Sequence, residues 1–235
     1  EDLLAFYLIT GGVAKYVALL MEAGAVTFNQ MIRYTIRPDS PFLSEGRDLL
    51  ISEFGREYAT YFSILQLIAS GKTSQSEIDS IIGKEYSLIN RNNPMFSKPE
   101  SRNSRWCLND NYLMFWFRFI FPNLSMIELG KNNMLEQFIL KNYEQYSGRI
   151  LERYFRDMIA ESEDITDIGN YWDNKGENEI DLIALNRFEN KALIAEVKRN
   201  FHKVNIARLY EKVATIKKQL AHYTLDIKGL SMQDM

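Results

Sequence analysis

The stretch NEIDLIALNRFENKALIAEVKR, residues 178–199, decides the fold of the C-terminal part of the chain. It contains two aliphatic runs, Ile180–Leu185 and Ala192–Lys198, which a polar segment separates, and this pattern predicts two strands. A helix with an apolar stripe is predicted before them over residues 148–160, and a basic helix after them over residues 206–223. Helices combined with strands in this order predict an α/β unit, here a mixed sheet flanked by helices.

Charged side chains gather at one end of the two predicted strands. Because side chains alternate along a strand, Glu196 and Lys198 share a face, and hairpin pairing brings Asp181 to the same edge. Paired carboxylates suit Mg²⁺, which takes one or two of them together with waters and phosphate oxygens. Such a cation polarises a phosphodiester and activates a bound water, while a lysine orients that water or offsets developing charge. A surface ion pair at the end of a buried strand is the alternative.

Charge is distributed unevenly along this part of the chain. Residues 150–181 contain 10 acidic and 3 basic residues, whereas residues 182–228 contain 10 basic and 4 acidic residues. An acidic stretch beside a basic one fits a cation site next to a surface that binds a polyanion. Solvated helix faces whose charges offset one another are the alternative explanation of this pattern.

The composition predicts a folded chain and excludes several classes of protein. The 235 residues are 46% hydrophobic and 25% charged, ordinary values for a globular protein. Cys107 is the single cysteine, so an internal disulfide framework and a cysteine-rich zinc site are excluded. The two histidines, His202 and His222, leave little room for a histidine-based metal centre. The apolar run Tyr112–Phe121 is half the length of a membrane span and no secretion signal is found, so we expect a cytoplasmic protein.

The first half of the chain is predicted to contain three segments. Residues 1–45 are expected to be a small all-helical segment, and residues 123–146 a connecting helix. Residues 46–122 have the outline of a winged-helix domain, and the aromatic cluster at their end is expected to pack as a core helix. The expected elements of this domain are a helix over Arg56–Ala69, a short helix over residues 74–82, and strands over Tyr86–Ile89 and Ser104–Leu108.

The strand residues resemble the signature of the PD-(D/E)XK nuclease superfamily, an aspartate followed on the next strand by Asp/Glu-x-Lys. Asp181 and Glu196-Val197-Lys198 fit this signature. The superfamily usually adds an acidic residue on the preceding helix, a position that Glu152 matches. Some members place a glutamine on the following helix, for which Gln219 is the candidate, and Trp172 is a candidate supporting residue.

This resemblance implies a nuclease-like domain over residues 147–235. In it, Asp181 and Glu196 hold Mg²⁺, Lys198 assists the attacking water, and Glu152 tunes the site or adds a second metal.

Further motifs resemble a bacterial and archaeal family of AAA+-type ATPases that contains domain of unknown function 234 (DUF234). They are Thr10–Tyr16, Asn109–Phe119 and Tyr171–Asp181. In this family an ATPase domain precedes a winged helix and a nuclease-like domain. The resemblance implies that residues 1–45 are the remnant of an ATPase lid. Because the chain contains no G-x-x-x-x-G-K-[ST] motif, ATP is expected to bind only to a preceding ATPase core.

The same resemblance identifies a departure from the family in the winged helix. Gly83-Lys84 meets Glu85-Tyr86 directly, so the recognition helix that the family has at this point is either deleted between residues 84 and 85 or left out of the given sequence. Sequence-specific reading of DNA by this domain is therefore not expected.

Three functions are compatible with these residues. The first is a Mg²⁺-dependent DNA endonuclease on a winged-helix adaptor, the second a non-cleaving module that binds DNA or docks on the ATPase, and the third a subunit fragment for ring or partner assembly. The expected partners are DNA, the ATPase core of the same protein and further copies of the chain, with no membrane. The residues expected to contact DNA are Arg199, Lys203, Arg208, Arg102 and Arg105.

Overall fold

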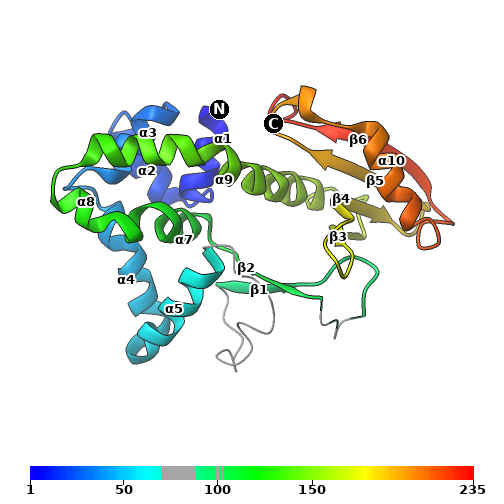
Figure 1. The fold of residues 1–235 in the computed structure, drawn as a ribbon, viewed down its shortest axis with the longest axis horizontal. Coiled ribbons are helices and arrows are strands. Elements are labelled where there is room, and N and C mark those ends of the chain that lie inside the picture. The colour runs from blue at the N-terminus through cyan, green and yellow to red at the C-terminus, as the bar shows by residue number, and fades with distance from the viewer. Residues whose placement is uncertain (70–87, 99–100, 102) are drawn as a thin grey trace. The chain divides into compact units, whose positions relative to one another are not determined.

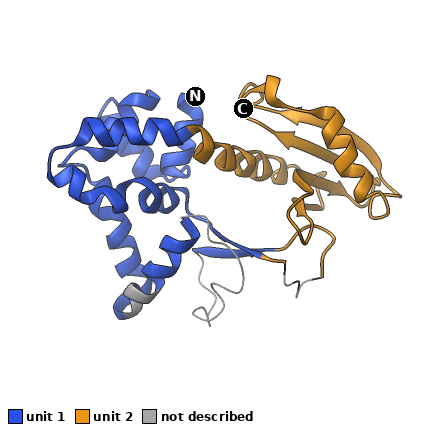
Figure 2. Cartoon of the chain, viewed as in Figure 1, with its two compact units in different colours: residues 1–92, 105–143 blue, residues 93–104, 144–235 orange. Residues whose placement is uncertain are grey.

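The computed structural model describes residues 1–69, 88–98, 101 and 103–235 of the chain. It divides the chain into two compact units, which Figure 2 shows in different colours. Unit 1 comprises residues 1–92 and 105–143, and unit 2 comprises residues 93–104 and 144–235. No helix in the described ranges is long and apolar enough to span a bilayer.

Unit 1 is built mainly from helices, with one small hairpin. Its hairpin strands β1 and β2 pair antiparallel, with Ile89 opposite Leu108. In chain order its elements are α1 (Asp2–Thr10), α2 (Ala14–Glu22), α3 (Phe28–Ile36), α4 (Phe42–Phe54), the 3-10 turn η1 (Gly55–Glu57), α5 (Tyr58–Ala69), β1 (Ile89–Asn92), β2 (Arg105–Leu108), α7 (Asn111–Phe115), the π-helical turn η2 (Trp116–Ile120), the 3-10 turn η3 (Phe121–Asn123), α8 (Leu124–Glu128) and the first part of α9 (Asn132–Ala160).

Helix α4 runs through residue 45, where the sequence suggested a boundary between the all-helical segment and the winged-helix segment. The aromatic run, residues Tyr112–Phe121, packs against both of these segments, as expected of a core element. The Trp116 ring lies only 2.3 Å from where a Cβ at Gly46 would stand, so this close contact needs a glycine. Trp116 Nε1 donates to the Leu43 carbonyl at 3.0 Å, and the Tyr112 hydroxyl donates to the Phe42 carbonyl at 2.7 Å.

One helix and one hairpin are the parts of the expected winged helix that the structure describes. Helix α5 covers most of the helix expected over Arg56–Ala69, and β1 and β2 overlap the expected strands. The short helix expected over residues 74–82 and the junction between Lys84 and Glu85 lie outside the described residues. The complete winged helix therefore stays a prediction.

Unit 2 is a mixed sheet with helices, as the sequence predicted, and the sheet has four strands (Figure 1). The strand order is β3-β4-β5-β6, in which β4 pairs antiparallel with both β3 and β5, whereas β5 and β6 are parallel. After the second part of α9, its elements are β3 (Asp167–Trp172), β4 (Glu179–Asn186), β5 (Lys191–Val197), the 3-10 turn η4 (Phe201–Lys203), α10 (Ile206–Thr215) and β6 (Thr224–Leu230).

The structure corrects three expectations about the elements that surround β4 and β5. The helix expected over residues 148–160 and the connecting helix from Asn132 onward are one helix, α9, of 29 residues, whereas Leu124–Glu128 form the separate helix α8. Gly148 does not interrupt it, because a single glycine costs only about 1 kcal/mol inside a helix. The basic helix ends at Thr215 instead of residue 223, and β6 closes the unit. Strands β3 and β6 were not expected; both are edge strands, and most of their residues are not fully buried, so their apolar signal is weak.

Helix α10 covers the sheet face on which the charged residues lie. It connects β5 to the parallel strand β6 and packs across β4, β5 and β6. Leu209 and Val213 on the helix pack with Ile183 and Ile194 on the sheet. Since side chains two positions apart share a face, Asp181 and Glu196 lie on this same face, one step beyond the apolar core.

Candidate functional site

The pairing of β4 and β5 sets Asp181 and Glu196 side by side. Leu182 is opposite Ala195 in the antiparallel register, and Asp181 and Glu196 are the next residues along each strand. Lys198 follows Glu196 by two positions and so projects on the same face. The structure thus brings together the aspartate, the glutamate and the lysine that the sequence predicted as one site.

Asp181 is held by two donors at the end of β5. Its Oδ2 accepts from the backbone N–H of Val197 at 2.9 Å and from the Lys198 ammonium at 3.0 Å. The side chain is only 14% exposed, so it has lost much of its contact with water. The Lys198 ammonium also donates to the Val197 carbonyl at 3.1 Å, which holds it beside the carboxylate.

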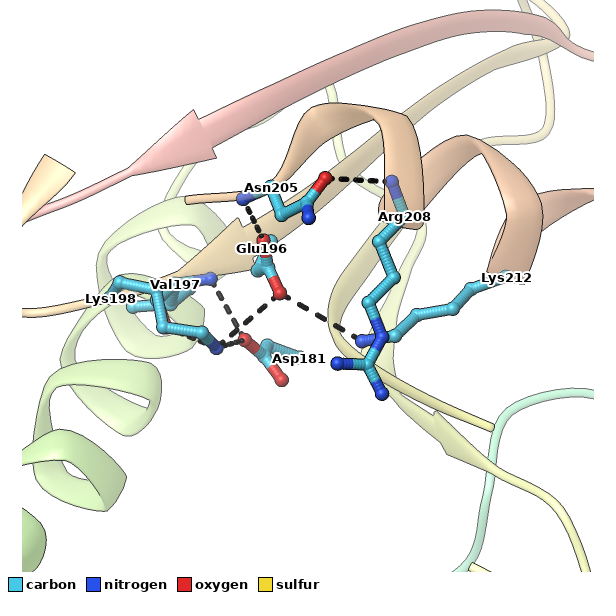
Figure 3. Close-up of polar contacts among 7 residues, drawn as sticks. All are labelled: Asp181, Glu196, Val197, Lys198, Asn205, Arg208 and Lys212. Atoms are coloured by element: carbon cyan, nitrogen blue, oxygen red, sulfur yellow. Dashed lines mark hydrogen bonds and ion pairs between the residues drawn. The ribbon is translucent and has the colours of Figure 1, made fainter. Parts of the chain in front are cut away.

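Glu196 is more deeply buried than Asp181, with a side chain 7% exposed, and Figure 3 shows its polar contacts. Its Oε2 accepts from the backbone N–H of Asn205 at 2.7 Å. Its Oε1 lies 3.6 Å from the ammonium nitrogen of Lys198 and 3.9 Å from that of Lys212. Asn205 caps α10 by accepting from the Arg208 N–H at 2.9 Å, so the start of α10 and the end of β5 are tied to one carboxylate.

Glu152 on α9 is electrostatically linked to this cluster, as the resemblance implied. Burial and, next in size, the charge of Asp181 raise the pKa of Glu152 to about 7, although the charges of Arg156, Lys198 and Arg149 act in the opposite direction. For Lys198, burial lowers the pKa, but the charges of Asp181 and Glu196 and the hydrogen bond to Asp181 outweigh it, so that its pKa is raised. Lys198 therefore stays an ammonium at neutral pH.

The two supporting residues named from the sequence have different surroundings. Gln219 is exposed in the turn that follows the C-terminal end of α10. Glu196 instead accepts a hydrogen bond from Asn205, at the N-terminal end of that helix. Trp172 is buried on β3, and its Nε1 donates to the Asn103 carbonyl at 2.9 Å. Trp172 thus fastens the segment of residues 93–104 to the sheet, and packing is its evident role.

Lys212 is the site residue that the sequence analysis missed. It lies three positions after the buried Leu209 and next to the buried Val213, and its side chain is only 16% exposed. The sequence did contain a signal for this residue, a lysine beside the buried stripe of a helix. Such a lysine is partly buried, and a buried ammonium needs an anionic partner. That partner is Glu196.

The basic residues expected to contact DNA have different surroundings. Arg199 donates to the Ser147 hydroxyl, and Lys203 is exposed and pairs with Glu144 at 2.6 Å. Arg208 is exposed on the first turn of α10. Arg105 lies on β2 in unit 1, and Arg102 lies outside the described residues.

Asp181 and Glu196 are the residues of this site that could hold a divalent cation. Across the described part of the chain, the structure contains no group of three or more histidine, cysteine, aspartate or glutamate residues arranged to hold a metal. Asp181 and Glu196 nevertheless supply adjacent carboxylates, and Mg²⁺ is commonly held by one or two carboxylates with waters and phosphate oxygens completing its shell. The donor set therefore matches Mg²⁺ bound together with a phosphate group.

Comparison with known proteins gives a family match and one relative. Residues 116–210 match the family model DUF234, described as archaea bacterial proteins of unknown function. The chain is 32% identical over 218 residues to the uncharacterized protein MJECL04 of Methanocaldococcus jannaschii. The matched region covers 84% of this chain and 48% of the relative. The chain thus spans about half the length of the curated relative it matches. No solved structure matches the chain.

Proposed function

We propose that unit 2 binds DNA and hydrolyses its phosphodiester bonds with the help of a divalent cation. The observation that carries this proposal is the placement of two carboxylates and an ammonium at one end of β4 and β5. Asp181 and Glu196 are neighbours on paired strands, and the Lys198 ammonium lies 3.0 Å from the first and 3.6 Å from the second. The resemblance of these residues to the PD-(D/E)XK signature supports the same chemistry.

Each residue of the cluster has a distinct role in this proposal. Asp181 and Glu196 hold Mg²⁺, which when bound polarises the phosphodiester and lowers the pKa of a bound water. The Lys198 ammonium offsets the negative charge that develops on the phosphate oxygens during attack. Because its pKa is about 7, Glu152 gains or loses its charge near neutral pH and so tunes the net charge beside Asp181.

A non-cleaving DNA-binding module is the second candidate function. The ion pairs of the carboxylates favour this second candidate. Lys198 pairs with Asp181, and the ammonium groups of Lys198 and Lys212 both lie near Glu196. Two ammonium groups balance two carboxylates without a metal. On this alternative the cluster stabilises the sheet end and the surrounding basic residues bind the phosphate backbone.

The wider architecture is proposed from the family resemblance. Unit 1 then supplies the winged-helix adaptor and the remnant of an ATPase lid, and ATP binds to an ATPase core that precedes these residues in the parent protein. The half of the relative's length that lies outside the match is long enough to contain such a core.

A plasmid-nicking assay with Mg²⁺ tests the two candidate functions. Asp181→Asn and Lys198→Met are each expected to slow cleavage about 100-fold or more, since they remove groups that act on the transition state. The matched control is Lys217→Met, which removes an exposed lysine from the turn after α10 and is expected to cleave at the wild-type rate.

Equal cleavage by all of these proteins would reject the assigned roles. DNA binding that weakens with salt, without cleavage by the wild type, would select the non-cleaving module. A wild-type protein that neither binds nor cleaves would reject both candidates.

A further inference from the structure

Helix α10 presents two cations on one side, next to the carboxylate cluster. Arg208 and Lys212 are four residues apart, the spacing at which side chains are neighbours on a helix surface. Figure 3 shows the Lys212 side chain directed toward Glu196, with the Arg208 side chain beside it. Both the side chain and the backbone of Lys212 have polar partners. Its ammonium lies 3.9 Å from Glu196 Oε1. Its backbone carbonyl accepts from the Thr215 hydroxyl at 2.7 Å and from Asn178 Nδ2 at 3.4 Å.

Arg208 adds a cation to this side of the helix, beyond the two ammonium groups that lie near Asp181 and Glu196. Glu196 is shared among the Asn205 N–H and the ammonium groups of Lys198 and Lys212. Among the described residues, the Arg208 guanidinium makes no ion pair and is exposed. Like charges four residues apart on a helix repel each other and destabilise it unless an anion lies between them. The arrangement therefore leaves room for an external anion at Arg208 and Lys212.

Resting on the proposed function, we propose that Arg208 and Lys212 form a phosphate-binding subsite beside the Asp181–Glu196 cluster. A guanidinium binds phosphate through paired hydrogen bonds, and an ammonium acts as a point charge, so the two complement each other on one phosphate group. Glu196 fixes the position of Lys212 and Asn205 fixes the start of the helix. A phosphate here is additional to the one at the carboxylates, so the substrate is a polynucleotide strand rather than a mononucleotide.

The test is the salt dependence of binding to a fluorescently labelled DNA duplex of mixed sequence, measured with the whole chain over a series of KCl concentrations. Each lost phosphate contact lowers the slope of log K against log salt by about 0.9. Arg208→Gln and Lys212→Met are expected to lower the slope by about that amount and to weaken binding several-fold at low salt. Lys212→Arg keeps the charge and is expected to retain the wild-type slope, as is the control Lys217→Met.

The outcomes separate this subsite from the proposed function. If the wild type binds and cleaves DNA but Arg208→Gln and Lys212→Met give the same slope as Lys217→Met, the subsite is overturned and the proposed function stands. If the wild type does not bind DNA, both are overturned. Because Arg208 is exposed, its substitution is not expected to impair folding, and circular dichroism with thermal unfolding checks that Lys212→Met is folded before its slope is compared.

Discussion

The aromatic run of unit 1 and the end of β5 in unit 2 both bury polar atoms, but they satisfy them differently. In unit 1 the Trp116 indole and the Tyr112 hydroxyl each donate to one backbone carbonyl, and no charge is involved. In unit 2 the Glu196 carboxylate is shared by several donors, two of them ammonium groups. The neutral donors of unit 1 are each satisfied by one carbonyl, whereas the Glu196 carboxylate is shared by several donors next to the exposed Arg208. We therefore expect substitutions in the first region to change stability and those in the second to change binding and pH dependence.

The largest effect on stability is expected from Trp116→Ala. This side chain is buried and contacts Phe62, Phe117 and Phe121, so its removal leaves a large cavity and costs about 3–5 kcal/mol. Phe188→Ala removes an aromatic ring that is 90% exposed and is expected to change stability by less than about 0.5 kcal/mol. Urea unfolding measures both, and similar losses for the two variants would contradict the assignment of the aromatic run to the core.

A smaller loss is expected from adding a methyl group at Gly46. Its Cβ would lie within 2.3–2.7 Å of three atoms of the Trp116 ring, so Gly46→Ala is expected to destabilise unit 1 by about 1–3 kcal/mol. Gly148→Ala is the matched control, since nothing lies within 4 Å of its Cβ position in α9, and it is expected to stabilise the protein by about 0.5–1 kcal/mol. Changes of opposite sign in thermal unfolding would sharpen the contrast between a crowded and an open glycine, and destabilisation by both variants would contradict it.

The pH dependence of stability probes the charged region. Burial and the charge of Asp181 raise the pKa of Glu152 from its ordinary 4.5 to about 7, so the folded protein binds this proton more tightly than the unfolded chain does. The resulting stabilisation is complete below about pH 4.5 and is lost as the pH rises through 7. Glu152→Gln is expected to remove this fall, which amounts to about 1–2 kcal/mol because the side chain is only partly buried.

The control for this titration is Glu163→Gln, which removes a carboxylate from an exposed position after α9. It is expected to keep the wild-type dependence of unfolding free energy on pH. A wild-type profile for Glu152→Gln would show that Glu152 is solvated like Glu163 and does not belong to the cluster.

The sequence predicted the elements whose burial pattern is strong. Strands β4 and β5 agree with the predicted runs to within one residue at each end, because both are central in the sheet and mostly buried. The same reasoning did not find β3 and β6, which lie at the edges and carry few fully buried residues. It also divided α9 at Gly148, where the buried stripe on both sides outweighs the cost of one glycine.

The sequence predicted the part of the site that follows from strand alternation and residue spacing. Asp181, Glu196 and Lys198 could be placed together because a hairpin and a period of two residues fix their relations. Gln219 was named because some members of the resembling superfamily place a glutamine on the following helix, which was expected to continue to residue 223. The actual end of α10 at Thr215 leaves Gln219 in the following turn.

By itself, the sequence determined that Asp181, Glu196 and Lys198 share the end of a buried hairpin, since strand pairing and side-chain alternation are local rules. Only the tertiary structure decided which groups complete that cluster. Glu152 and Lys212 come from helices whose contacts with the sheet depend on packing, and the Asn205 N–H reaches Glu196 because the start of α10 folds back onto β5. Contacts between elements distant in sequence follow from how apolar faces are buried together, and no short stretch of sequence specifies that.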